Sequence, residues 1–232
     1  TRAYASQPGL LHFPSLSQVS YFDRSLMPWL EEIEAMTETV EAELQDVLAS
    51  PASESFVPYI NYPPGVPVNQ WKDLNHSRKW STWFFWMNGA RQNEACRRAP
   101  KTAAILDAAP LIHVPNIGPT AMFSSLAARM QIPPHTGSTN ARAIVHLPLI
   151  LPGPAWFRVG NDRREWRKGE AWAFDDTVEH EAMNNADATR TILIFDVWNP
   201  YLTEVEREMV SALLQAKLAF QRRAGAQEPL FS

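Results

Sequence analysis

The 232-residue chain is poor in two residue types, with a single cysteine, Cys96, and nine glycines. One cysteine excludes an intrachain disulfide framework and any cysteine-rich zinc or iron–sulfur site. A lone thiol is also more typical of a reducing compartment, which leaves the location open but favours the cytoplasm. The scarcity of glycine, beside nineteen prolines and nine tryptophans, indicates a rigid, aromatic-rich protein.

Long apolar runs and a strong excess of one charge are also missing. No stretch approaches the roughly 18 apolar residues of a membrane helix, and the N-terminus lacks the basic-then-apolar pattern of a signal peptide. A formal net charge of −4 gives no reason to expect a nucleic-acid partner. Apolar residues at 45% and charged residues at 20% are typical of a globular chain. Because the chain does not begin with methionine, we expect a processed product or a piece of a longer protein.

The first half of the chain reads as helices around a proline-rich connector. Apolar residues recur at helical spacing from Ser25 to Val47, and Pro28 falls in the first turn of that predicted helix. Residues 50–75 contain five prolines and predict irregular chain, although their aromatic side chains require burial. A second helix is predicted over residues 92–108, with an interruption at Pro100.

Short strands separated by turns dominate from about residue 79 onward. Alternation over residues 79–89 predicts a strand with Trp80, Phe84 and Trp86 on one side. Short strands at this spacing indicate a sandwich or barrel, closed by a helix over residues 203–219. The later predicted strands are Thr120–Leu126, Ala143–Leu149, Ala155–Val159, Glu165–Arg167, Ala171–Phe174, His180–Met183 and Arg190–Trp198. The fold class is therefore α+β, with helices packed on an all-β core.

Two of the six histidines, His135 and His180, have the setting of metal ligands. His135 lies in a predicted turn, made rigid by two prolines, just before a strand, and His180 begins a strand after an acidic turn. Two histidines on neighbouring strands of a barrel can converge on one first-row metal ion. Non-haem iron sites usually add a carboxylate two residues after the first histidine, but that position is Gly137. A purely structural role for both histidines remains open on spacing alone.

Four segments resemble the aspartyl/asparaginyl β-hydroxylase family of Fe(II)/2-oxoglutarate dioxygenases. They are "NEACRRAPKT" (93–102), "PHTGSTNAR" (134–142), "GEAWAFDDTVEHE" (169–181) and "ILIFDVWNPYLT" (192–203). The resemblance implies a double-stranded β-helix, a jelly-roll or cupin-like core with N- and C-terminal helices packed on it. It also implies one oxygenase domain over 1–232, with a helical and proline-rich part at 1–75, the family core at 79–203 and a C-terminal helix at 203–225.

The resemblance assigns His135 and His180 as the iron ligands and treats Gly137 as the residue of a branch that lacks the carboxylate. Water, halide or a nearby carboxylate is then expected at the open metal position. For the neighbouring acids, Asp175, Asp176, Glu179 and Glu181, we expect turn formation and hydrogen bonds around the ligands, with direct metal contact as the alternative.

The resemblance also assigns a 2-oxoglutarate site. Arg190 lies ten residues after His180 in an apolar strand, where an unpaired guanidinium is costly unless an anion binds it. Ser124, His146 and Arg142 complete the co-substrate contacts, and Arg91 and Arg142 are predicted substrate contacts. Animal family members carry a second arginine where this chain has Ile144. Binding of the keto-acid carboxylate or of the substrate is therefore expected to differ.

The function implied is β-hydroxylation of Asp or Asn residues in a peptide or protein, with Fe(II), 2-oxoglutarate and O2 as cofactors and succinate as co-product. An alternative keeps these cofactors but acts on a free amino acid or another small metabolite. A lower alternative is a non-catalytic, cupin-like metal-binding protein. The partner is therefore a peptide or an amino-acid-like small molecule, with no membrane segment in this chain.

Overall fold

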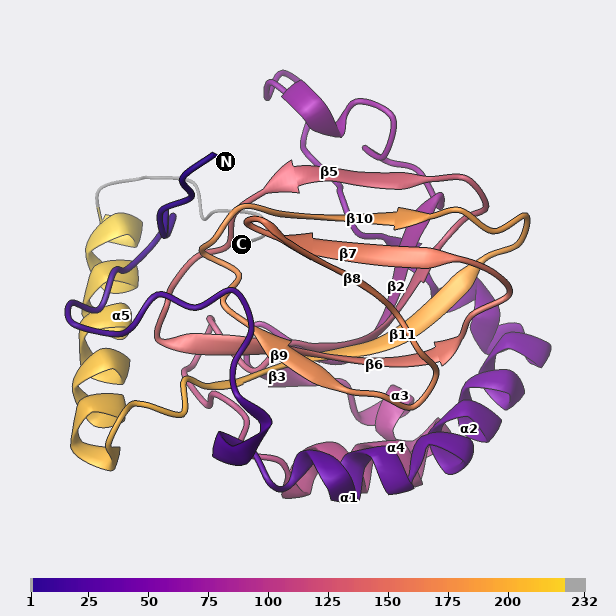
Figure 1. The fold of residues 1–232 in the computed structure, drawn as a ribbon, viewed down its shortest axis with the longest axis horizontal. Helices are drawn as coiled ribbons and strands as arrows, with labels where there is room; N and C mark the ends of the chain where they lie inside the picture. The colour runs from indigo at the N-terminus through magenta and orange to yellow at the C-terminus, as the bar shows by residue number, and fades with distance from the viewer. Residues whose placement is uncertain (1, 224–232) are drawn as a thin grey trace.

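A computed structural model describes residues 2–223 and contains two antiparallel sheets that lie face to face (Figure 1). The seven-stranded sheet has the order β1-β2-β4-β11-β6-β9, with β3 paired to β2, and the four-stranded sheet has the order β5-β10-β7-β8. Strands of the large sheet are β1 (Val57–Pro58), β2 (Trp80–Met87), β3 (Ala90–Arg91), β4 (Ala121–Leu126), β6 (Arg142–Ile150), β9 (Trp172–Phe174) and β11 (Arg190–Trp198). Strands of the small sheet are β5 (Gln131–His135), β7 (Ala155–Val159), β8 (Asp162–Glu165) and β10 (His180–Asn184).

The helices cover the outer face and one end of the large sheet (Figure 1). They are α1 (Leu30–Ala35), α2 (Thr37–Ala49), α3 (Asn93–Arg98), α4 (Pro100–Ala108) and α5 (Glu204–Arg223). Helix α2 buries Val40, Leu44 and Val47 in the same apolar cluster as Val145 and Leu147 of β6. One face of the large sheet is therefore covered by helices, and its other face is turned toward the small sheet.

Most predicted elements are present, with two informative shifts in the helical part. The helix predicted from Ser25 to Val47 is divided at Met36 into α1 and α2. The interruption predicted at Pro100 separates α3 from α4, because proline is tolerated only in the first turn of a helix. The closing helix begins at Glu204, and the last residues of the predicted 203–225 segment lie outside the described residues.

Two predictions about strands are wrong. Trp80 and Trp86 do not share a side of β2, because the register shifts between Phe84 and Trp86 and the two tryptophans join different apolar clusters. The segment before His135 is strand β5 and not a turn, although it contains Pro133 and Pro134. Those prolines are accommodated because β5 is an edge strand, where missing N–H groups leave few ladder bonds unmade.

The pairing of β11 with both β4 and β6 places the interior-facing side chains of the large sheet in register. Ile194 lies opposite Met122 on one side and His146 on the other, and Asp196 lies opposite Ile144. In the small sheet, His180 lies opposite His135 and Val159. Two facing antiparallel sheets with helices outside form a double-stranded β-helix, or jelly roll, of the cupin type. None of the helices within residues 2–223 has both the length and the apolar character needed to cross a bilayer.

Candidate active site

A cavity of about 430 Å³ opens between the two sheets. Its walls combine histidines of the small sheet with arginine, aspartate and aliphatic side chains of the large sheet. The proline-rich connector supplies aromatic side chains at the same cavity, Tyr59, Tyr62 and Trp71. A pocket of this size suits one or two small organic molecules.

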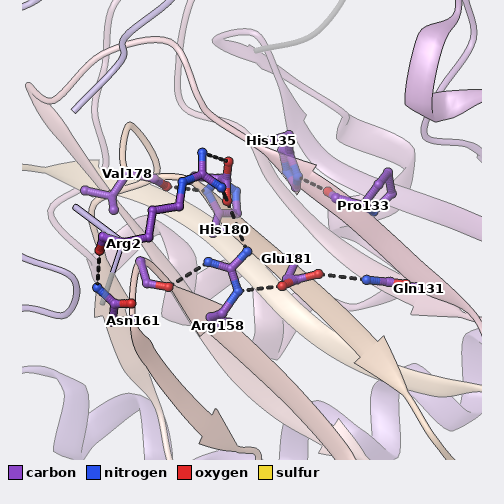
Figure 2. A network of polar contacts seen from close by, with 11 residues as sticks. Arg2, Gln131, Pro133, His135, Arg158, Asn161, Val178, His180 and Glu181 are labelled. Atoms are coloured by element: carbon purple, nitrogen blue, oxygen red, sulfur yellow. Dashed lines mark hydrogen bonds and ion pairs between the residues drawn. The ribbon is translucent and has the colours of Figure 1, made fainter. Parts of the chain in front are cut away.

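His135 and His180 lie side by side, with ring centroids 4.1 Å apart. Each Nδ1 contacts a backbone carbonyl oxygen two residues earlier, at 2.8 Å to Pro133 and 3.0 Å to Val178 (Figure 2). A carbonyl oxygen only accepts hydrogen bonds, so each Nδ1 carries the proton and each Nε2 keeps its lone pair. Burial lowers the pKa of His135 to about 3 and that of His180 to about 4, so both rings are neutral near pH 7.

The space beside Gly137 is filled by the side chain of Asp176. A Cβ built on residue 137 would lie 1.9 Å from Asp176 Oδ2, and the Gly137 N–H donates to the Asp176 carbonyl oxygen at 2.6 Å. Asp176 Oδ2 accepts from Arg142 Nη2 at 2.7 Å, whereas the buried Oδ1 has no hydrogen-bond partner. Of the occupants expected beside Gly137, which were water, halide or a nearby carboxylate, the structure has the Asp176 carboxylate at this position.

These groups fit a divalent first-row metal ion. Two neutral imidazoles with free Nε2 atoms are good ligands, and an unpartnered carboxylate oxygen beside them suits a cation or its bound water. Among residues 2–223, no group of three or more His, Cys, Asp or Glu side chains is arranged to hold a metal. The histidine pair, with Asp176 beside it bound to Arg142 through Oδ2, is thus the candidate metal centre.

The other acids near His180 fix the chain around it. Asp175 accepts from the N–H and hydroxyl of Thr177, which closes the turn before β10. Arg158 on β7 binds both Glu179 and Glu181, the two neighbours of His180 (Figure 2). These contacts match the turn and hydrogen-bonding roles expected for the acids, and they hold β10 against β7.

Arg190 is a fully buried cation on β11. Arg190 is 1% exposed. Its Nη1 donates to the Ser124 carbonyl oxygen at 3.1 Å, and its guanidinium lies 4.6 Å from the Trp166 ring centroid. None of the ion pairs found within residues 2–223 includes Arg190, and its Nε has no hydrogen-bond partner. Burial removes water from this guanidinium and lowers its pKa to about 9. A carboxylate ligand would supply the missing counter-charge.

Ser124 and His146 lie on the strands that flank Arg190. Ser124 Oγ accepts from Trp80 Nε1 at 3.1 Å, so the serine is held in place before any ligand arrives. The His146 ring packs between Phe157 and Phe174, and its buried Nδ1 has no partner. Burial and the charge of Arg190 hold the pKa of His146 well below its usual value. Arg190, Ser124 and His146 therefore form one polar group inside the barrel.

The two predicted substrate arginines are placed very differently. Arg142 lines the cavity, but its Nη2 binds Asp176 and its Nη1 binds Asp196 Oδ2 at 3.2 Å. Arg91 lies on β3 outside the cavity, where it binds Asp107 at 3.0 Å and stacks on Trp86. The structure therefore does not bring Arg91 to the site.

Sequence reasoning missed Asp196 and the aromatic side of the cavity. Trp71 lies edge-on to His135 with centroids 5.0 Å apart, and Tyr59 and Trp80 are in ring contact. One signal could have found this aromatic side: the connector has little regular structure, yet its aromatic residues must be buried somewhere. Asp196 sits in the otherwise apolar strand β11, where a lone acid predicts either a buried partner or a site.

Comparison with known proteins places the chain in a family. Residues 34–200 match the Aspartyl/Asparaginyl beta-hydroxylase family, and the chain belongs to it. The human aspartyl/asparaginyl beta-hydroxylase is 34% identical over 150 residues, which cover 64% of this chain and 20% of that protein.

Other relatives cover more of this chain. The ornithine lipid ester-linked acyl 2-hydroxylase of Rhizobium tropici is 31% identical over 193 residues, covering 82% of this chain and 64% of that protein. The human aspartate beta-hydroxylase domain-containing protein 2 is 26% identical over 90% of this chain and 55% of that protein. The chain thus spans between a fifth and two thirds of the length of these relatives.

The similarity to solved structures is weaker. The cupin domain of Schizosaccharomyces pombe Cnp3 aligns with a TM-score of 0.35 and 8% identity, covering 73% of this chain and 82% of that chain.

Proposed function

We propose that this chain is an Fe(II)- and 2-oxoglutarate-dependent dioxygenase that hydroxylates a C–H bond of an organic substrate. Membership of the family supports a hydroxylase. The observation that carries the proposal is the neutral pair of His135 and His180, 4.1 Å apart, in the same cavity as His146. Arg190, a buried guanidinium for which no ion pair is found among residues 2–223, supports a carboxylate co-substrate in addition to the metal.

The residues have distinct roles in this proposal. His135 and His180 hold Fe(II) through Nε2, and Asp176 presents Oδ1 to the ion or to its water. When bound, iron supplies the activation of O2 that couples decarboxylation of 2-oxoglutarate to oxidation of the substrate. Arg142 holds the Asp176 carboxylate through Oδ2 and so sets the direction of Oδ1.

The co-substrate site follows from the same groups. Arg190 binds the distal carboxylate of 2-oxoglutarate, and Ser124 adds a hydrogen bond from the neighbouring strand. His146 lies on β6, which pairs with β11 on the side opposite the Ser124 strand, and contacts the keto-acid end. The aromatic residues of the connector exclude water from the reacting centre.

The substrate carried over from the family name is the β-carbon of Asp or Asn residues in a peptide or protein. The alternative is the same chemistry on a small metabolite, and the name of the Rhizobium tropici relative describes an acyl group. The buried ion pairs of Arg142 favour the alternative, because they occupy the cavity's arginine before an acidic substrate arrives. A non-catalytic cupin-like protein stays the lowest candidate.

Oxygen-dependent conversion of 2-oxoglutarate to succinate tests the proposal. Purified protein is incubated with Fe(II), ascorbate and 2-oxoglutarate, with and without O2, and succinate is measured together with addition of one oxygen to candidate substrates. His135→Ala should abolish succinate formation, whereas His113→Ala, which changes an exposed histidine elsewhere, should not. If well-folded, iron-loaded protein forms no O2-dependent succinate, the oxygenase proposal is wrong and the non-catalytic cupin-like protein is the candidate that is left.

A further inference from the structure

Helix α5 carries an apolar stripe on its solvent side. The helix lies at one end of the molecule and packs on the core through Val210, Leu214 and Leu218 (Figure 1). Within residues 2–223, the four most exposed of the large apolar side chains are all on this helix. These four residues, with exposed fractions from 55% to 72%, form the α5 stripe: Val205, Met209, Leu213 and Phe220.

The spacing of the α5 stripe puts its members on one line along the helix. The first three are each four positions apart, and Phe220 lies seven positions beyond Leu213. At 3.6 residues per turn they share one face, which is opposite to the face that Leu214 buries. The exposed residues between them on this face are small, namely Ala212, Ala216 and Ala219. A continuous apolar surface of this kind is typical of an interaction site.

The charges of α5 are divided between its two ends. Its first five residues include three glutamates and one arginine, and its last two residues are Arg222 and Arg223. If two copies of the helix pack antiparallel, the acidic end of each lies beside the basic end of the other. A parallel pair would bring like charges together. The charges therefore favour an antiparallel pair of identical helices.

One antiparallel register covers the whole α5 stripe. In this register the two-fold axis passes between residues 212 and 213, and every large residue of the stripe faces a residue of the stripe or an alanine beside it. The facing pairs are Ala212 with Leu213, Met209 with Ala216, and Val205 with Phe220. Because each of the two central pairs joins a large side chain to a small one, the helices can approach closely without a clash.

The same register brings charges of opposite sign together. Glu204 and Arg222 are eighteen residues apart, which is five helical turns, so both lie on one flank of the stripe. The two-fold axis places Arg222 of one copy beside Glu204 of the other, and it does so twice. The surface at Glu204 is hollowed by a depression of about 460 Å³, which is also lined by Glu208, Arg207 and Trp198. Two carboxylates, one cation and an indole ring suit an incoming guanidinium.

We propose that α5 is a dimerisation helix, and that its partner is α5 of a second copy of this chain in antiparallel orientation. A lipid surface suits this helix less, because helices that lie on membranes carry cations along their polar face and α5 has three glutamates at one end. A single helix pair is at the small end of the range for specific interfaces. We therefore expect a dimer with a Kd between about 1 and 100 µM.

Sedimentation velocity of the full chain, from about 1 to 300 µM, measures this association. Leu213→Glu places two carboxylates at the two-fold axis in an apolar contact, so the Kd should rise at least about thirtyfold. Leu48→Glu is the matched control, because it changes another exposed leucine to the same acid on α2, away from the stripe. This control should associate like the parent.

Cross-linking tests the direction and the register of the pair. The thiol of Ala212→Cys lies next to its own copy across the axis and should form an intermolecular disulfide under mild oxidation. Ala219→Cys changes another exposed alanine of the same face, but in the antiparallel pair it lies about 20 Å from its own copy and should not cross-link. A parallel pair would cross-link at both positions. The native Cys96 is buried and is kept in all variants.

Charge reversal tests the contact between the two ends. Glu204→Arg places two cations together at each end, so the Kd should rise at least about threefold. Adding Arg222→Glu should restore the parent Kd. If these charges serve only the dipole of their own helix, the double substitution reverses both favourable ends and restores nothing.

The results decide between the second copy and other occupants of the stripe. A full chain that stays monomeric up to about 300 µM overturns the inference. This holds equally if the monomer binds phosphatidylglycerol vesicles, or if it dimerises only after removal of residues 224–232. Loss of the dimer in Leu48→Glu, or a disulfide in Ala219→Cys, overturns it as well. If Leu213→Glu does not fold, the two cysteine variants still decide the question.

Discussion

Asp176 Oδ2 lies 1.9 Å from the point where a Cβ on residue 137 would be, so Gly137 and Asp176 share one space beside the histidine pair. The two residues come from different motifs, one two residues after His135 and the other four residues before His180. Gly137 does not have a left-handed backbone conformation. Glycine is therefore required here by the neighbouring carboxylate and not by a turn.

Any side chain at residue 137 should destabilise the fold unless Asp176 is removed. Gly137→Ala and Gly137→Asp both place a Cβ against the Asp176 carboxylate, and overpacking of this kind costs about 1–3 kcal/mol. Adding Asp176→Ala to either variant should recover much of the lost free energy of unfolding. A double-mutant cycle, with denaturant unfolding of the metal-free protein, measures this recovery. Gly9→Ala is the control, because its added Cβ would meet only an ordinary contact at 3.8 Å. Additive effects of the two changes would show that the two residues do not compete for space.

Loss of either histidine should remove the metal, whereas loss of Asp176 should not. His135→Ala or His180→Ala leaves a single imidazole ligand, so Fe(II) binding measured by anaerobic calorimetry should disappear. Asp176→Ala keeps both Nε2 donors, and Arg142 keeps Asp196 as a partner, so metal affinity should fall but remain measurable. If Asp176→Ala removes the metal as completely as either histidine change, Asp176 is a direct ligand and the two-histidine centre is wrong.

Local patterns in the sequence predicted the strands and helices that carry the site. The apolar run Arg190–Trp198 and the helical apolar spacing in residues 30–47 depend on neighbours close in sequence, and they appear as β11, α1 and α2. Strand β5 was missed because Pro133 and Pro134 argue against a strand unless it is known to lie at an edge. Edge position is set by pairing between distant segments and cannot be read locally.

In the candidate site, too, features carried by local motifs were predicted and contacts between distant segments were not. His135 and His180 were predicted from motif resemblance, and their pairing across β5 and β10 places them together. The double engagement of Arg142 could not be predicted, because Asp176 and Asp196 are 34 and 54 residues away in sequence. Nor could the placement of Trp71 against His135, since the connector has no regular period from which to infer direction.

Replacing Arg190 should have opposite effects on the free protein and on co-substrate binding. Arg190→Met removes a buried cation for which no ion pair is found among residues 2–223, so the metal-free protein should be as stable or more stable. The same change should weaken 2-oxoglutarate binding by about 2–5 kcal/mol, since the co-substrate loses its charged partner.

Thermal unfolding with and without 2-oxoglutarate measures both effects of Arg190→Met. Ser124→Ala should weaken 2-oxoglutarate binding by only about 1 kcal/mol, the value of one hydrogen bond. Arg91→Met, which changes an exposed arginine away from the cavity, should leave co-substrate binding unchanged. Unaltered 2-oxoglutarate affinity in Arg190→Met would remove Arg190 from the site.

The buried histidine pair should make the metal-free protein less stable as the pH falls from 7 to 5. The pKa of His135 is about 3 in the folded protein against an ordinary 6.5, so between these values the unfolded chain binds more protons. Stability then rises with pH in this window and is lost as pH falls below 6.5, by about 2 kcal/mol at pH 5 for one such histidine. Asp175 and Asp196 act in the opposite direction, because burial raises the pKa of each to about 6 and the folded state takes up protons first.

Because these acids oppose the histidines, the pH dependence of stability of the unsubstituted protein does not give the contribution of one histidine. A substitution at His135 does. His135→Asn keeps a side-chain N–H for the Pro133 carbonyl but removes the titrating ring, so the variant should lose about 2 kcal/mol less stability than the parent between pH 7 and pH 5. Urea unfolding at several pH values in a chelating buffer measures this difference. His113→Asn, at an exposed position, should follow the parent curve. A His135→Asn curve parallel to that of the parent would mean that His135 takes up its proton in the folded state, and the neutral, metal-ready histidine pair would have to be abandoned.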